Sequence, residues 1–146
     1  MGKYFSIDEL CVTYTKFDNI PTDEIIKNLN ELIYVLDDIR EKWTELCNIN
    51  GWGNGAIIVT SGYRSPKVNS AVGGKKTSEH LLGYAVDMKP KNGKNLEFFN
   101  MIKNYLITNN IPFSQLINEK PINGVPSWVH FSINGKKGYR KEIFIE

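Results

Sequence analysis

Residues 78–87 have the sequence Ser-Glu-His-Leu-Leu-Gly-Tyr-Ala-Val-Asp, in which a glycine lies between a histidine and an aspartate. His80 and Asp87 are seven residues apart, which on one continuous helix would place them two turns apart, too distant to share an ion. Gly83 between them breaks a helical path, so that His80 comes from a loop or a helix end and Asp87 from the strand that follows. The stretch therefore predicts a turn at which an imidazole and a carboxylate converge.

The second of the chain's two histidines, His130, lies within residues 127–132, which have the sequence SWVHFS. If this segment is a strand, the apolar neighbours of His130 point to one face of the sheet and His130 points to the other. A catalytic zinc site uses three protein ligands, usually imidazole nitrogens or carboxylate oxygens, and keeps a fourth position open for water. His80, Asp87 and His130 form a set of this kind.

The alternative interpretation is that both histidines are core residues with ordinary hydrogen bonds. Asp87 is harder to explain in this way, because it lies among apolar residues and an unpaired buried carboxylate is costly. It needs a cation or several hydrogen-bond donors. Spacing alone leaves the two interpretations open.

A long amphipathic helix is expected from Thr22, its cap, to about Cys47. Apolar residues recur along it at three- and four-residue steps and predict one buried stripe, formed by Ile25, Leu29, Leu32, Ile33, Leu36, Ile39 and Trp43. Shorter helices are expected at 5–10, 66–71 and 96–108, and strands at 56–60, 84–88, 113–118, 128–133 and 142–145. These elements predict an α+β fold with helices packed on a small, mostly antiparallel sheet that carries the metal site.

The composition is that of an ordinary globular protein, with 41% apolar and 23% charged residues among 146. No apolar run approaches the ~20 residues that span a bilayer, so we expect no membrane insertion. Residues 1–10 lack the apolar stretch of a signal peptide, and we expect synthesis in the cytoplasm. Cys11 and Cys47 fit no zinc motif and are expected to be buried free thiols.

The net charge of +2 is unevenly distributed along the chain. Residues 1–55 carry 5 basic and 10 acidic side chains, a net charge of −5, whereas residues 56–146 carry 13 basic and 6 acidic ones, a net charge of +7. The basic part contains both histidines. It indicates either an affinity for an anionic polymer or a solvated lysine-rich surface. No nucleic-acid motif accompanies it, so no nucleic-acid partner is expected, and we expect a monomer.

Several motifs together resemble the M15 family of D-Ala-D-Ala carboxypeptidase-like zinc peptidases. They are SGYRSP at 61–66, S-x-H-x-x-G-x-A-x-D at 78–87, QLIxE at 115–119 and WVHxS at 128–132. Residues 5–10 and 28–40 resemble the phage endolysin-type branch of that family. The resemblance therefore extends over nearly the whole chain, and it implies a single zinc peptidase domain spanning residues 1–146.

By position, the resemblance also implies roles for individual residues. It makes Zn²⁺ the cofactor, with His80, Asp87 and His130 as its ligands. Arg64 matches an arginine that binds the substrate or stabilises the negative charge of the tetrahedral intermediate. Ser78 matches a serine close to the bound peptide, and Trp128 matches an aromatic residue that supports the last ligand and lines the substrate site.

The general base is the point at which this sequence departs from several relatives. They carry an acidic residue three positions before the last histidine, where this chain has Ser127, and serine cannot act as a base at neutral pH. Glu119 is the substitute that we expect, provided that segments 113–118 and 128–133 pair as a hairpin. Glu79 is a further candidate, although we expect it to face away from the metal because its neighbour His80 faces it.

The function that the resemblance implies is hydrolysis of a peptide bond in bacterial peptidoglycan, next to a D-amino acid, by a phage-type endolysin that acts on the cell wall after release. The same zinc site serves carboxypeptidases and endopeptidases, so both remain open. Two alternatives also remain, a non-catalytic zinc-containing module that binds the cell wall and a virion-associated wall hydrolase.

Overall fold

Five strands form one sheet in a computed structural model that describes residues 2–146. The strands are β1 (Ile57–Ser61), β2 (Ala85–Pro90), β3 (Gln115–Glu119), β4 (Trp128–Ser132) and β5 (Glu142–Ile145). Their order in the sheet is β1-β2-β4-β3-β5, and every neighbouring pair is antiparallel except β3 and β5. The predicted α+β fold with a mostly antiparallel sheet is confirmed.

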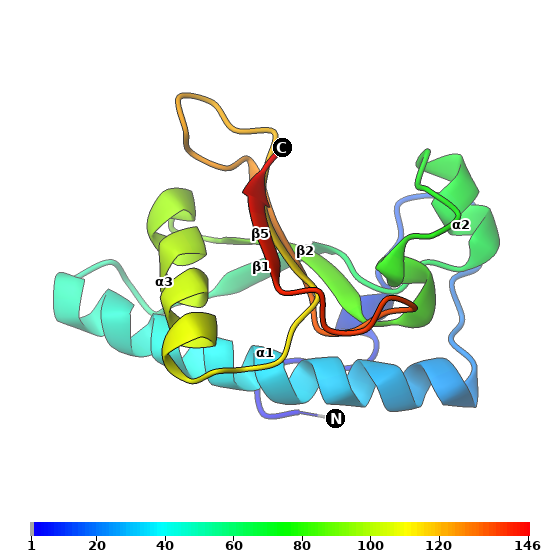
Figure 1. The fold of residues 1–146 in the computed structure, drawn as a ribbon, viewed down its shortest axis with the longest axis horizontal. Coiled ribbons are helices and arrows are strands. Elements are labelled where there is room, and N and C mark those ends of the chain that lie inside the picture. Colours follow the sequence, from blue (N-terminus) through cyan, green and yellow to red (C-terminus); the bar gives the residue numbers. More distant parts are fainter. Residues whose placement is uncertain (1) are drawn as a thin grey trace.

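One face of the sheet is covered by the two longest helices, α1 (Asp23–Asn50) and α3 (Asn95–Thr108), as Figure 1 shows. Their apolar side chains share one core with side chains from β2, β3 and β4, among them Val86, Leu116 and Val129. Because side chains alternate along a strand, the neighbours of these core residues point to the opposite face. We call this opposite face, which bears Asp87 and His130, the site face.

Helix α1 forms as its sequence pattern predicts. The Thr22 hydroxyl accepts a hydrogen bond from the Ile25 amide at 3.3 Å, and the apolar stripe is buried from Leu29 onwards. The helix ends three residues later than expected, at Asn50, because Gly51 is the first residue with a left-handed backbone conformation (φ 68°). None of the described helices combines the length and the apolarity needed to cross a membrane.

The N-terminal segment differs from the prediction. The Ser6 hydroxyl does accept a hydrogen bond from the Glu9 amide, but only a 3₁₀ turn, η1 (Glu9–Cys11), follows it. The turn ends because Val12 is extended and the Leu10 carbonyl accepts a hydrogen bond from Tyr63 instead of continuing a helix. Both cysteines are free; Cys47 is buried as expected, whereas Cys11 is partly exposed.

Two short elements shape the site face. Helix α2 (Pro66–Ala71) lies on the side of the sheet away from α3 (Figure 1), with the bounds that the sequence predicts. A 3₁₀ turn, η2 (Glu79–Leu82), precedes β2. Gly83 ends η2 with φ 77° and turns the chain into the strand, as its position in the sequence predicts.

Candidate metal centre

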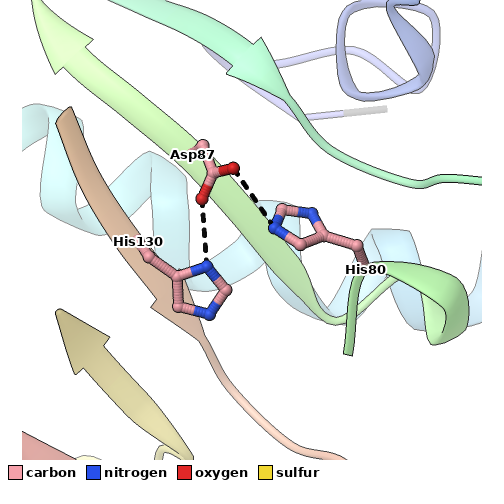
Figure 2. A group of neighbouring side chains, drawn as sticks. All are labelled: His80, Asp87 and His130. Atoms are coloured by element: carbon pink, nitrogen blue, oxygen red, sulfur yellow. Dashed lines mark hydrogen bonds and ion pairs between the residues drawn. The ribbon is translucent and has the colours of Figure 1, made fainter. Parts of the chain in front are cut away.

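His80, Asp87 and His130 meet on the site face, where each offers a ligand atom and these atoms all lie within 4.8 Å of one another. They come from η2, β2 and β4, as Figure 2 shows. Asp87 lies directly opposite His130 in the antiparallel pairing of β2 and β4, so both side chains leave the same face. The sequence-predicted metal ligands are therefore brought together.

His80 is held in a defined orientation. Its Nδ1 lies 2.7 Å from the Gly62 carbonyl oxygen. A carbonyl only accepts hydrogen bonds, so Nδ1 carries the proton and Nε2, 3.3 Å from Asp87 Oδ2, presents its lone pair to the centre. Burial lowers the pKa of His80, which favours the neutral imidazole that a metal ion requires.

Asp87 is the central member of the cluster. Burial alone would raise the pKa of its carboxyl group, but the charges and hydrogen bonds of His80 and His130 outweigh this and hold the pKa below its ordinary value. The side chain is thus an ionised carboxylate that lies between the two imidazoles. Such a group is a suitable ligand for a divalent cation.

His130 does not behave as a satisfied core histidine. Its Nδ1 lies 3.0 Å from Asp87 Oδ1, while its Nε2 is buried and has no hydrogen-bond partner among residues 2–146. A buried polar atom without a partner costs free energy, so it calls for an explanation such as a catalytic role or a bound ion. This observation weighs against the alternative that the two histidines are ordinary core residues.

The residues present fit a zinc ion. Two imidazole nitrogens and one carboxylate oxygen are a donor set that catalytic zinc uses, and three protein ligands leave a fourth position for water. The hydrogen bond from His80 to Gly62 is the kind of support that fixes a ligand's tautomer and orientation.

Arg64 lies beside this cluster and is fixed by three partners. Its Nη2 is 3.3 Å from Asp87 Oδ2, its Nε donates to the Ser61 hydroxyl at 3.0 Å, and its Nη1 donates to Asn69 Oδ1 at 3.3 Å. Burial lowers the pKa of Arg64, against the effect of the Asp87 charge, and the guanidinium stays charged. A fixed positive charge therefore borders the centre.

Ser78 and Trp128 each lie two residues before one of the two histidines. The Ser78 hydroxyl accepts a hydrogen bond from the His80 amide at 3.2 Å and so caps η2. Trp128 lies two residues before His130 on β4 and shares its face, partly exposed. Their predicted contacts with a substrate stay predictions.

Glu119 lies on the same face as His130, because Ile117 is opposite His130 and the alternation of β3 returns Glu119 to that face. The expected pairing of the two hairpin strands is present. Burial is the main cause that raises the pKa of Glu119 to about 7, and the charge of Glu146 is the next. The charge of Asp87 also raises this pKa, whereas that of His130 lowers it. The carboxyl group is thus within electrostatic reach of the candidate centre, and its role as the base stays a prediction.

The family model of peptidase M15 matches residues 3–116 of the chain. The chain belongs to the M15 peptidase family. No curated protein sequence matches it.

The family match covers some of the site residues of this M15 peptidase and not others. His80, Asp87 and Arg64 lie inside the matched region, whereas His130 and Glu119 lie beyond its end at residue 116. The place of His130 beside Asp87 therefore rests on the pairing of β2 with β4.

Glu79 is buried and points into a network that sequence reasoning did not anticipate. Its carboxylate accepts hydrogen bonds from Ser114 and Ser132 and pairs with Arg140. With these partners it is poorly placed to act as a base. Its contacts come from residues far along the chain, so the only signal in the sequence was an acidic residue next to His80.

Proposed function

We propose that this M15 peptidase is a zinc-dependent hydrolase that cleaves a peptide bond in bacterial peptidoglycan, next to a D-amino acid, as an enzyme of the endolysin type. The observation that carries this proposal is the convergence of His80, Asp87 and His130 beside the fixed guanidinium of Arg64. Peptide hydrolysis needs an activated water and a compensating charge for the intermediate, and this arrangement is suited to provide both.

In this proposal His80, Asp87 and His130 hold the zinc ion. When bound, zinc supplies Lewis acidity, which makes water a nucleophile at neutral pH and polarises the substrate carbonyl. The protein's own contribution begins with His80, because the Gly62 carbonyl keeps its Nε2 unprotonated and turned to the centre. Asp87 brings a negative charge that lowers the net charge of the site.

Arg64 is proposed to act on the substrate. Its guanidinium is held by Ser61 and Asn69, so it keeps one orientation as the reaction proceeds. It can offset the negative charge of the tetrahedral intermediate, or it can hold a free D-alanine carboxylate through paired hydrogen bonds. These two roles differ in whether its loss lowers kcat or raises KM.

Glu119 is proposed to take the proton from the attacking water and pass it to the leaving amine. A pKa of about 7 matches this exchange, because a group that accepts and then returns a proton works best when its pKa is near the working pH. Ser78 and Trp128, which each lie two residues before one of the histidines, are proposed to contact the peptide.

The proposed substrate is supported by the family and by charge. The part of the chain that carries the site has a net charge of +7, which favours approach to an anionic wall polymer. We propose that the enzyme acts as a monomer, without nucleic acid, and that it is made in the cytoplasm and reaches the wall after release.

The test is hydrolysis of purified peptidoglycan by the metal-free protein, with and without added Zn²⁺. We expect free amino groups to appear with zinc and to disappear again with excess chelator. His130→Ala should abolish the reaction, whereas Lys67→Ala, an exposed change on α2, should not. Mass spectrometry of the digested muropeptides would distinguish release of a terminal D-amino acid from cleavage of a crosslink.

Two outcomes would contradict the proposal. Release of amino groups that is unaffected by chelator and by His130→Ala would exclude zinc-dependent hydrolysis at this centre. Sedimentation of the protein with peptidoglycan, without release of any amino group at any zinc concentration, would instead indicate a wall-binding module.

A further inference from the structure

We propose that Glu79 is a positioning residue that fixes His80 and His130 relative to each other, so that the centre is formed before a metal ion arrives. This inference rests on the proposed metal site. Glu79 is 6% exposed and directly precedes His80 in η2. The proposal concerns its side chain together with Ser114, Ser132 and Arg140, which we call the Glu79 network.

The contacts of the Glu79 network are short and complete. Oε1 of Glu79 accepts from the Ser132 hydroxyl at 2.7 Å and pairs with Arg140 Nη2 at 3.1 Å, while Oε2 accepts from the Ser114 hydroxyl at 2.8 Å. Both serines are 0% exposed. Arg140 Nε also donates to the Ser114 hydroxyl at 3.1 Å, which closes a ring of polar contacts. A buried polar network satisfied in this way is rigid.

The two serines connect Glu79 to different parts of the sheet. Ser132 lies two residues after His130 on β4 and therefore on the same face, so the bond from Glu79 to Ser132 joins the turn that carries His80 to the strand that carries His130. Ser114 precedes β3, a strand that supplies none of the three ligands. The hydrogen bond between Ser132 and Glu79 Oε1 therefore supports the metal centre, whereas the one between Ser114 and Oε2 does not.

The turn that carries His80 needs such support. η2 is a four-residue 3₁₀ helix, and elements of this kind have poor internal hydrogen-bond geometry and are short. A ligand on a short turn is held by contacts with its surroundings. Small errors in ligand placement reduce metal affinity, and residues that support ligands typically contribute about 10–100-fold to it.

Arg140 extends the centre to the C-terminal segment, residues 134–141, which Figure 1 shows running past η2. Gly135 lies against the Glu79 carboxylate so closely that a Cβ atom at this position would overlap it. The segment lies beyond the region matched by the family model. Its contribution to the site is the partly exposed positive charge of Arg140, which compensates the buried Glu79 carboxylate.

The experiment measures Zn²⁺ affinity of the metal-free protein by competition with a chromophoric chelator, and the visible spectrum of the Co²⁺ form. Ser132→Ala and Ser114→Ala are a matched pair, because each removes one fully buried hydroxyl from Glu79. We expect Ser132→Ala to weaken zinc affinity about 10-fold or more and to change the cobalt spectrum, and Ser114→Ala to change affinity by less than about threefold. Arg140→Gln, on a partly exposed side chain, should weaken affinity as well.

The possible results are distinct. Equal zinc affinities and cobalt spectra for the wild type, Ser132→Ala and Arg140→Gln, with only lower unfolding midpoints, would make the Glu79 network purely structural. Equal weakening by both serine variants would overturn the proposed role of Ser132 in linking the two histidines. Failure of the wild type to bind zinc would overturn the metal site itself and the positioning role with it.

Discussion

Glu119 differs from Asp87 in the direction of its pKa shift, although both carboxyl groups belong to the site face. Asp87 lies between two imidazoles, which favour its ionised form. Glu119 is partly buried and faces Glu146, so its protonated form is favoured and its pKa rises to about 7. The environment therefore separates a permanent anion, suited to bind a cation, from a group that exchanges protons near neutral pH.

We expect the side-chain carboxyl carbon of Glu119 to titrate near pH 7 in the metal-free protein, as measured by NMR. The groups that act on it are Glu146, His130 and Asp87. Glu146→Gln removes one negative charge that raises the pKa, so the midpoint should move to lower pH. Glu142→Gln, at the start of β5 and paired with Gln115 and Arg140, should leave the midpoint in place. A Glu119 midpoint near 4.5 in the wild type would contradict this assignment.

The sign of the effect on activity follows from the role of a base, which must be ionised to accept a proton. Activity is expected to rise as pH increases through the pKa of Glu119 and to fall below it. Bound zinc adds positive charge and lowers that pKa, so the acidic limb should lie at or below about pH 7. Glu119→Gln should remove this limb together with about 10²-fold or more of the rate. If the limb persists in this variant, another group is the base.

Arg64 is expected to matter for the substrate and not for retention of the metal. Arg64→Gln removes a positive charge 3.3 Å from Asp87, so zinc affinity should stay the same or increase. Peptidase activity should nevertheless fall about 10²–10³-fold, measured as kcat/KM. Lys67→Gln, an exposed change nearby on α2, is the control and should have no effect on either quantity. Loss of zinc affinity in Arg64→Gln would show that Arg64 stabilises the centre itself.

At the scale of elements, Gly83 is required for the approach of His80 to Asp87. Its φ of 77° is left-handed, and a Cβ atom would lie 3.0 Å from Ile25 Cγ2. Gly83→Ala should therefore lower the free energy of unfolding by about 1–3 kcal/mol through backbone strain and crowding. Gly73→Ala is the matched control, because Gly73 has φ 74° but no atom within 4 Å of the added Cβ.

The comparison is made by urea unfolding of the metal-free proteins. Gly73→Ala should show the backbone strain alone, about 1 kcal/mol. The additional loss of unfolding free energy in Gly83→Ala measures the cost of the contact with α1. Zinc affinity should fall in this variant only. Equal unfolding free energies for the two variants would mean that α1 accommodates the added methyl group without loss of stability.

The elements that the sequence predicts well are those with a local signal. Helix α1 has a cap, a periodic apolar stripe and a terminating glycine, and α2 begins at a proline after a serine cap. The sequence predicts a turn or helix end at His80 but does not specify the 3₁₀ form of η2, because four residues carry no periodicity. The strand order and the parallel contact of β5 with β3 depend on pairings between distant segments, which single strands do not specify.

The residues of the candidate site also differ in whether a local signal in the sequence predicts their place. Convergence of His80 and Asp87 was predictable, because both lie in one motif with a glycine turn between them. His130 could be named as a possible third ligand from its position in a strand, but the resemblance to a family was needed to decide for it, since nothing local pairs β4 with β2. The Glu79 network escaped prediction because Ser114, Ser132 and Arg140 are ordinary residues in their own segments and become partners only in the folded chain.

At the scale of the whole molecule, the three candidate ligands come from three different elements. His80 lies on a turn that follows α2, Asp87 on a strand next to β1, and His130 on the strand that pairs with β3. A metal ion bound by all three stabilises the native state and has no equivalent site in the unfolded chain. Metal binding and global stability are therefore linked.

This linkage gives a prediction that does not depend on the substrate. Zn²⁺ at about 100 times its Kd should stabilise the native protein by ~2.7 kcal/mol and raise Tm, measured by calorimetry on metal-free protein. His130→Ala should lose most of this increase, because two remaining ligands bind zinc weakly. Mg²⁺ should raise Tm little, since it prefers oxygen ligands and the centre offers two imidazoles. Equal increases in Tm for the wild type and His130→Ala would place zinc elsewhere on the molecule, and the centre on the site face would then need a different occupant.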